Sequence, residues 1–124
     1  MNERKKILLI EDDDFIARAY KVGLEREGFE IEIASDGAQG FAAIKRDGHA
    51  LILLDIILPK MDGFEVLQKL KEEPHSQTIP VIILSNLGQD SDVERGKALG
   101  AVDYLVKANT SMDEVVKKVR EQLS

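Results

Sequence analysis

The sequence predicts an α/β fold, a doubly wound parallel sheet of five strands in which a helix follows each strand. Three observations lead to this prediction. Short apolar runs alternate five times with longer helix-like segments. Those segments have the length that a crossover between parallel strands requires. Three of the apolar runs show no polar alternation, which is typical of strands covered by helices on both faces.

The five apolar runs are the predicted strands. They occupy residues 6–10, 29–34, 50–54, 80–84 and 102–106. The first, third and fourth are continuously apolar and are expected in the centre of the sheet. The second, FEIEIA, alternates apolar with acidic residues, so we expect it at an edge with one face in solvent. This pattern favours the strand order 2-1-3-4-5.

The five predicted helices are residues 14–27, 37–48, 63–73, 90–99 and the segment from 111 onward. Gly28 follows the first helix, where a left-handed residue commonly ends a helix. Asp36 precedes the second and is a suitable N-cap. Ser111 begins the last, and Glu114 three residues later completes a capping-box pattern.

The length and amino-acid composition of the chain exclude several classes of protein. At 124 residues the chain is long enough for one domain, which we expect over residues 1–124. The absence of cysteine excludes disulfides and thiolate metal sites. Seventeen basic and 23 acidic residues give a net charge of −6, which argues against direct nucleic-acid binding. No apolar run has membrane-spanning length and the first residues are no signal peptide, so we expect a cytoplasmic protein without membrane insertion. His49 and His75 lie in loop-like segments, and we assign them no role.

Acidic residues follow two of the predicted strands. Glu11 and Asp12 end the first strand, and Asp55 ends the third. In open α/β sheets, ligands bind beyond the carboxyl ends of the strands where the strand order reverses, here between strands one and three. Three converging carboxylates repel one another, and a hard cation such as Mg²⁺ relieves this repulsion. The alternative is that the acids only favour a helix N-terminus, with Asp13 or Asp14 as its cap, but that leaves Asp55 unexplained.

Two further strand ends carry polar side chains. Ser85 follows the fourth strand and supplies a hydroxyl, and Lys107 follows the fifth and supplies a cation. Taken singly, each is an ordinary turn or surface residue. Together with the carboxylates they form a group that can bind and stabilise a phosphoryl oxyanion.

With these residues in place, the sequence resembles the receiver domain of two-component response regulators over essentially its whole length. LLIEDD is similar to the family's acidic pair, LLDIILPKMDG to its phosphoacceptor strand and loop, PVIILS to its hydroxyl strand, and GAVDYLVK to its lysine strand. The resemblance implies the flavodoxin-like (βα)₅ fold and supports the strand order given above.

The resemblance also implies roles for the residues that match. Asp55 would be the phosphoacceptor, taking a phosphoryl group from a kinase phosphohistidine. Asp12 and Asp55 would bind Mg²⁺, Glu11 would hold it through water, and the backbone carbonyl of Ile57 would be a further ligand. Lys107 would pair with a phosphoryl oxygen.

A switch is implied as well. Ser85 would move toward the phosphoryl group, and Tyr104 would turn into the space that it leaves. Read without the resemblance, Tyr104 is an ordinary strand residue. Such a switch requires two packings of similar energy.

Two departures of the chain from the family pattern directly follow residues of the predicted site. Ala108 stands where proline usually follows the lysine, so we expect a trans peptide bond there, because a cis bond before another residue costs about 3 kcal/mol. Asn86 stands where a small residue usually follows the serine. It either narrows access to the phosphoryl site or bonds to it.

The first helix offers a candidate docking patch for a kinase or phosphotransfer protein. Phe15, Arg18 and Val22 lie on a different face from the predicted core stripe, and an exposed phenylalanine beside the acidic crevice suits a partner helix. The alternative is a scattered surface residue without a role. The predicted core stripe consists of Ile16, Ala19, Tyr20 and Leu24.

We therefore predict a phosphorylation-dependent signalling switch without an output domain, which catalyses only its own modification. A histidine kinase or phosphotransfer protein would supply the phosphoryl group, and a downstream protein would bind the fourth helix, fifth strand and fifth helix. The expected oligomeric state is either a monomer or a phosphorylation-dependent dimer. One alternative is a degenerate scaffold that works without phosphate. A second, an aspartyl-phosphate hydrolase, is disfavoured because Ile57 stands where such enzymes carry another acid.

Overall fold

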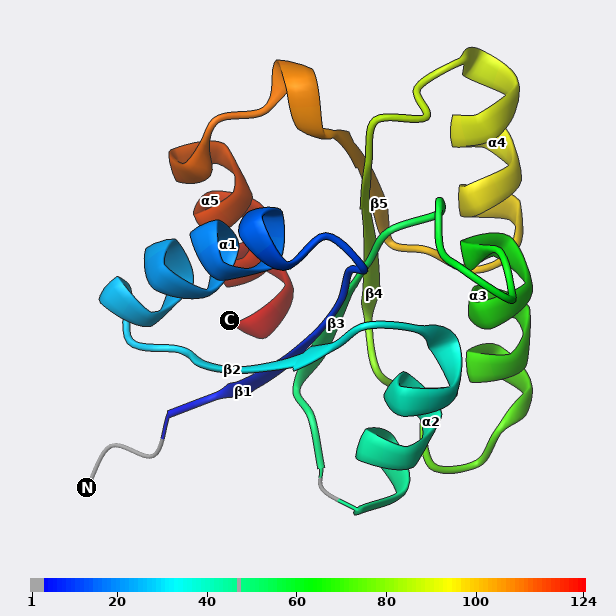
Figure 1. Cartoon of the computed structure of the whole chain (residues 1–124), viewed down its shortest axis with the longest axis horizontal. Helices are drawn as coiled ribbons and strands as arrows, with labels where there is room; N and C mark the ends of the chain where they lie inside the picture. The colour runs from blue at the N-terminus through cyan, green and yellow to red at the C-terminus, as the bar shows by residue number, and fades with distance from the viewer. Residues whose placement is uncertain (1–3, 47) are drawn as a thin grey trace.

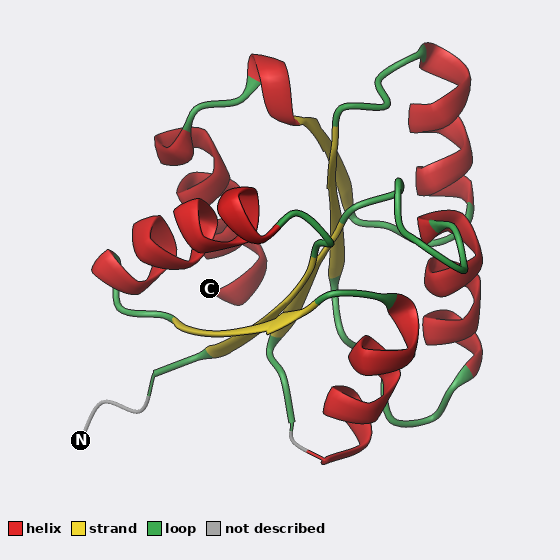
Figure 2. Ribbon diagram, in the orientation of Figure 1, coloured by secondary structure: helices red, strands yellow, loops and turns green. Residues whose placement is uncertain are grey.

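The computed structural model describes residues 4–46 and 48–124, and it shows a central sheet flanked by helices (Figures 1 and 2). The strands are β1 (Lys6–Ile10), β2 (Glu30–Ala34), β3 (Leu51–Leu54), β4 (Val81–Ser85) and β5 (Asp103–Val106). They pair in parallel in the order β2-β1-β3-β4-β5, as predicted. After β1, each strand begins one residue later than predicted, and β4 includes Ser85.

Helices cover both faces of the sheet. They are α1 (Asp14–Arg26), α2 (Gly37–Arg46), α3 (Gly63–Glu72), α4 (Asp90–Ala98) and α5 (Met112–Leu123), with a short 3₁₀ turn, η1 (Lys107–Asn109), after β5. Figure 1 shows α1 and α5 on one face and α2, α3 and α4 on the other. The second helix ends at Arg46, short of the predicted Gly48, and residue 47 lies outside the described residues. Among the described residues, no helix combines the length and apolar character needed to cross a lipid bilayer.

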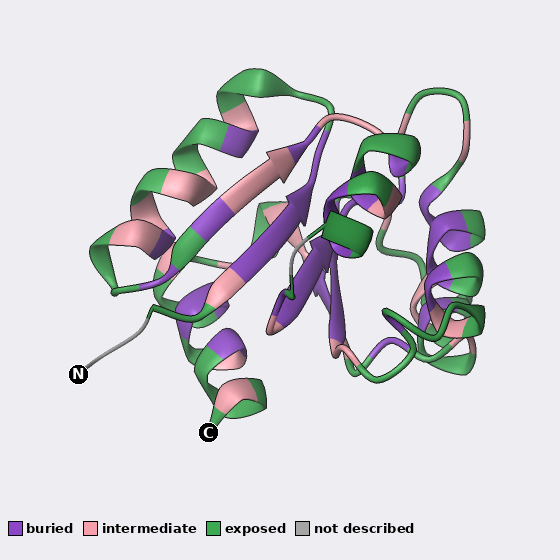
Figure 3. Ribbon diagram, turned by 90° about the horizontal axis from the view of Figure 1, so that it is seen from below, coloured by how far each residue is buried: buried purple, intermediate pink, exposed green. Residues whose placement is uncertain are grey.

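Alternate residues of the central strands build two separate cores. Leu8 of β1 and Ile52 of β3 face α2, α3 and α4, whereas Leu9 and Leu53 face α1 and α5, and all four are almost fully buried. Because both faces are covered, the interior positions of these strands are apolar, and polar residues are confined to the strand ends. Figure 3 shows the buried central strands, with exposed residues on the outer sides of the helices.

Polar caps fix where the helices begin. Asp13 accepts a hydrogen bond from the amide of Ile16 at 3.0 Å, so it is Asp13 that caps α1. Asp36 accepts one from the amide of Gln39 at 2.8 Å, and Ser111 forms the predicted capping box. These caps set the start of each helix immediately after a strand end or its loop.

The predicted core face of α1 is partly wrong. Ala17 and Leu24 are buried and Tyr20 is half-buried, whereas Ala19 is exposed. The buried positions follow the three- and four-residue spacing of a helix face, which includes Ala17 in place of the predicted Ala19. Ile16 is only half-buried, at the edge of that face.

Candidate functional site

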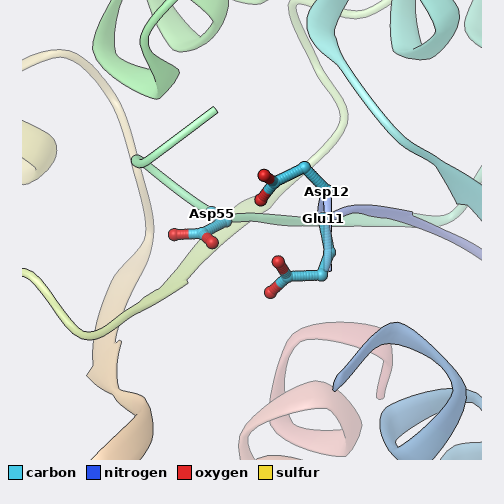
Figure 4. Close-up of side chains that lie close together, drawn as sticks. All are labelled: Glu11, Asp12 and Asp55. Atoms are coloured by element: carbon cyan, nitrogen blue, oxygen red, sulfur yellow. The ribbon is translucent and has the colours of Figure 1, made fainter. Parts of the chain in front are cut away.

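The three predicted carboxylates lie together at the carboxyl edge of the sheet. The amide of Glu11 donates to Ala34 O at 2.9 Å, and that of Asp55 donates to Ile10 O at 3.0 Å, so backbone pairing continues one residue beyond the strands. One carboxylate oxygen from each of Glu11, Asp12 and Asp55 lies within 4.8 Å of the other two. Figure 4 shows the three side chains side by side at the ends of β1 and β3. Glu11 and Asp55 are buried, and Asp12 is exposed.

The loop after β3 folds back against Asp55. The amide of Gly63 donates to Ile56 O at 2.7 Å, which closes the loop. A Cβ atom on Gly63 would collide with the backbone of Asp55 and Ile56, so only glycine permits this approach. The amide of Ile57 donates to Asp55 Oδ1 at 3.2 Å, which places the Ile57 backbone beside the carboxylates.

Lys107 is the cation of the site. Its Nζ bonds to Glu11 and also donates to Asp55 Oδ2 at 3.0 Å, and its side chain is only 9% exposed. Burial disfavours the ammonium, but the bonds to Glu11 and Asp55 outweigh burial and raise the pKa of Lys107 above its usual value. Burial raises the pKa of Glu11, and the bond from Lys107 offsets this only in part. One ammonium thus faces three carboxylates, so the donor set is suited to a further hard cation.

Ser85 lies at the same edge, one position further along the sheet. Since Leu54 is paired with Ile83, the end of β4 extends one residue beyond Asp55. Ser85 is fully buried, and its Oγ accepts a hydrogen bond from the amide of Leu87 at 3.3 Å. The hydroxyl proton is therefore available to another acceptor.

Tyr104 points into the protein. Its ring is packed against Gly96, where a Cβ would lie 3.0 Å from it, and its hydroxyl donates to Leu87 O. Burial raises the pKa of Tyr104 to about 12, so the hydroxyl keeps its proton at neutral pH. The backbone of Leu87 is therefore bonded both to Ser85 and to Tyr104, the two residues predicted to form a switch.

The two departures from the family pattern are in contact. The amide of Ala108 donates to Asn86 Oδ1 at 3.1 Å. Residues 4–46 and 48–124 contain no cis peptide bond, so the bond between Lys107 and Ala108 is trans, as expected. Asn86 is expected from the sequence either to narrow access to the phosphoryl site or to bond to it. The side-chain bond described for Asn86 is made instead to the neighbouring loop.

The predicted docking residues are on the surface. Phe15 is 85% and Val22 49% exposed, and Arg18 is also exposed. Ile57, 58% exposed, is a further apolar side chain beside the crevice that the sequence did not identify as a surface residue. Their exposure agrees with a docking patch, whose function stays a prediction.

The sequence did not predict that His49 is a buried polar residue. The His49 side chain is fully buried, and its Nε2 lies 3.0 Å from Glu32 Oε1, on the edge strand β2. Within the described residues, its Nδ1 has no hydrogen-bond partner. Burial opposes ionisation of Glu32, but His49, Arg46 and Lys6 outweigh this and lower its pKa. A lone histidine in a loop gave no signal of this contact, which requires the fold.

Known proteins are similar to this chain over most of its length. Residues 7–120 match the family model described as the response regulator receiver domain. The transcriptional regulatory protein SrrA of Staphylococcus aureus is 43% identical over 118 residues, covering 95% of this chain and 47% of SrrA. The chain thus spans about half the length of this relative.

Two solved structures are similar over nearly the whole chain. Chemotaxis protein CheY4 of Vibrio cholerae has a TM-score of 0.90 at 26% identity, covering 98% of this chain and 100% of that one. A CheY-like response regulator receiver domain protein from Methanospirillum hungatei has a TM-score of 0.89 at 30% identity, covering 98% and 94%.

Proposed function

The chain belongs to the response regulator receiver domain family, and we propose that it is switched by transfer of a phosphoryl group to Asp55. Receiver domains are signalling switches rather than enzymes in the ordinary sense. The observation that supports this proposal most strongly is the buried Asp55 carboxylate, 3.0 Å from the Lys107 ammonium and grouped with two other acids. A nucleophile, a cation and a metal-binding donor set then meet at one point.

The donor set fits Mg²⁺. The residues that would hold it are Glu11, Asp12 and Asp55, with the backbone carbonyl of Ile57, since Mg²⁺ prefers carboxylates, carbonyls and water. When bound, the ion supplies positive charge that offsets the negative charge of the three acids and of the phosphoryl oxygens.

The residues of the chain perform the transfer by positioning and charge. An oxygen of Asp55 attacks the phosphorus, and a P–O bond forms as the P–N bond to the donor histidine breaks. The leaving imidazole keeps the electron pair and takes a proton from solvent. Lys107, already bonded to Asp55, pairs with a phosphoryl oxygen, and the Ser85 hydroxyl donates its unused proton to another.

The switch then acts through Leu87. If Ser85 turns toward the phosphoryl group, the amide of Leu87 loses its acceptor, and the loop before α4 can rearrange around the bond between Tyr104 and Leu87 O. The loop would then have two local packings, and the change from one to the other would alter the surface formed by α4, β5 and α5.

The partners follow from the same proposal. A sensor histidine kinase or phosphotransfer protein would dock at Phe15, Arg18 and Val22, beside the crevice. A downstream protein would bind the switched surface. We propose that this domain makes no direct contact with nucleic acid and that it acts in the cytoplasm. Action without an output domain, and the choice between monomer and phosphorylation-dependent dimer, stay predictions.

The test is intact mass after incubation with acetyl phosphate. With Mg²⁺, the native chain is expected to gain one phosphoryl group, and without Mg²⁺ it is expected to gain none. Asp55→Asn, which keeps the shape of the side chain but is a far weaker nucleophile, is expected to gain none under either condition. No adduct on the folded native chain would contradict the proposal and favour a scaffold that works without phosphate.

A further inference from the structure

Asn86 connects two loops of the site beyond the end of the sheet. The pairing of β4 with β5 ends at Ser85 and Val106. Just past this pair, Asn86 Oδ1 accepts a hydrogen bond from the amide of Ala108 at 3.1 Å. A side chain thus extends the lateral connection where the backbones of the two strands no longer pair.

The amide of Ala108 needs an acceptor from outside its own turn. Ala108 lies in η1, and the first amides of a helical turn have no carbonyl partner within it. Val106, at the N-cap position, makes no side-chain cap bond. Asn86 supplies the missing acceptor from the loop that follows β4. A further side-chain bond, from Thr110 Oγ1 to Val106 O at 2.8 Å, stays within the loop itself.

Each end of this bond is next to a residue of the proposed chemistry. Asn86 directly follows Ser85, and Ala108 directly follows Lys107. Lys107 reaches Asp55 through a long side chain with several rotatable bonds, so the position of its backbone decides how often its Nζ lies 3.0 Å from Asp55.

We infer that Asn86 is a positioning residue, which holds η1 against the end of β4 and thereby keeps Lys107 directed at Asp55. This inference rests on the proposed phosphoryl transfer. It also explains why Ala108 is compatible with the site, since its amide proton, which proline would lack, is the donor of the bond. The two departures from the family pattern are then one interaction.

The chain offers a matched control. Asn109 is exposed like Asn86 and belongs to η1, and its side chain makes none of the hydrogen bonds found among residues 4–46 and 48–124. Asn109→Ala removes the same kind of group from the turn that Asn86 contacts. Asn86→Asp keeps the accepting oxygen at the same position in the side chain, whereas Asn86→Ala removes it.

Amide hydrogen exchange tests the contact itself. We expect the Ala108 amide to exchange about fivefold faster or more in Asn86→Ala, and to stay protected in Asn86→Asp and Asn109→Ala. Equal protection of Ala108 in the native chain and in Asn86→Ala would overturn the inference, because the bond would then not hold the turn.

Phosphoryl uptake tests the positioning. With Mg²⁺ and varied acetyl phosphate, Asn86→Ala is expected to lower the maximal rate about three- to tenfold, the scale of one hydrogen bond, with little change in half-saturation. Asn109→Ala is expected to keep the native rate and the native unfolding midpoint, because its side chain is exposed and makes none of the hydrogen bonds found among residues 4–46 and 48–124. A native maximal rate in Asn86→Ala would overturn the role of Asn86 alone. A native chain that takes up no phosphoryl group would overturn the proposed function together with that role.

Discussion

The two sides of the acidic crevice are built differently. On one side, Glu11 and Asp55 extend strands β1 and β3, and backbone hydrogen bonds to Ala34 and Ile10 hold them in the sheet. On the other side, the loops after β4 and β5 are connected to the Ser85 and Tyr104 hydroxyls and to Asn86 by single side-chain hydrogen bonds. We call these the sheet side and the loop side of the crevice.

The difference separates two requirements of a switch. A nucleophile must keep its position while it reacts, and backbone pairing within a buried sheet provides this. A signal requires a segment of the protein that has a second conformation of similar free energy. Single side-chain hydrogen bonds to loop backbone can be broken and replaced at a small cost in free energy. Lys107 spans both sides, since its backbone lies in the η1 turn and its Nζ lies against Glu11 and Asp55. The predictions below test this division.

The largest effect is expected at the residue that spans the crevice. Lys107→Ala should lower the rate of phosphoryl uptake by about 10²- to 10³-fold, because it removes a preorganised charge that stabilises the transferring group. Lys118→Ala is the control, since Lys118 forms an ion pair with Asp103 at 3.5 Å on a half-exposed surface. Uptake rates from intact mass would measure this, and a Lys107→Ala rate within about threefold of native would contradict the role of that charge.

The next effect concerns the rigidity of the sheet side. Gly63→Ala should lower the free energy of unfolding by about 1–3 kcal/mol, since the new Cβ must push away backbone of Asp55 and Ile56. Gly48→Ala is the matched control, because a Cβ there meets nothing within 4 Å. Urea unfolding of both variants checks this. Equal stability in the two would show that the loop after β3 adapts freely and that the sheet side is not rigid.

A smaller effect is expected on the loop side. Tyr104→Phe removes the hydroxyl that donates to Leu87 O and should lower the free energy of unfolding by about 1 kcal/mol, with uptake at Asp55 nearly unchanged. Tyr20→Phe is the control, since the Tyr20 hydroxyl makes none of the described hydrogen bonds. Stability measured in urea and uptake rates together decide this. A large loss of uptake in Tyr104→Phe would mean that the two sides are not separable.

The smallest effect is expected away from both sides, at Glu32. The pKa of Glu32 is lowered in the folded state from its usual 4.5, so its contribution to stability is present above that value and is lost as the pH falls through the folded pKa. Glu32→Gln should therefore flatten the loss of stability below about pH 4.5. Unfolding free energies measured between about pH 3 and 6 check this. An unchanged acid slope would mean that His49, Arg46 and Lys6 do not favour the carboxylate.

The sheet side could be predicted from the sequence because its residues directly follow the strands, and the strands can be located from the sequence alone. The carboxyl ends of parallel strands meet at one edge, so residues that directly follow strands must converge there. Glu11, Asp12 and Asp55 needed only correct strand ends, and Lys107 followed from the same reasoning. The fold was predicted for the same reason, since apolar runs and their caps mark the elements directly.

The loop side could not be predicted to the same depth. The bond between Asn86 and Ala108 depends on the paths of two loops, and no spacing in the sequence encodes it. The inward position of Tyr104 depends on a carbonyl in a separate loop. The burial of His49 required knowing that its ring meets Glu32 on the edge strand. Contacts between loops are set by tertiary structure, which sequence periodicity does not report.

The division between the two sides is tested most directly by amide hydrogen exchange with and without beryllium trifluoride, a phosphoryl analogue, in the presence of Mg²⁺. The account predicts that exchange of the Leu87 amide, which is bonded to Ser85 Oγ, changes by about fivefold or more. The amides of Asp55 and Gly63, bonded to backbone carbonyls, are predicted to stay within about twofold of their rates without the analogue. Comparable changes at Asp55, Gly63 and Leu87, or a change confined to the first two, would contradict it.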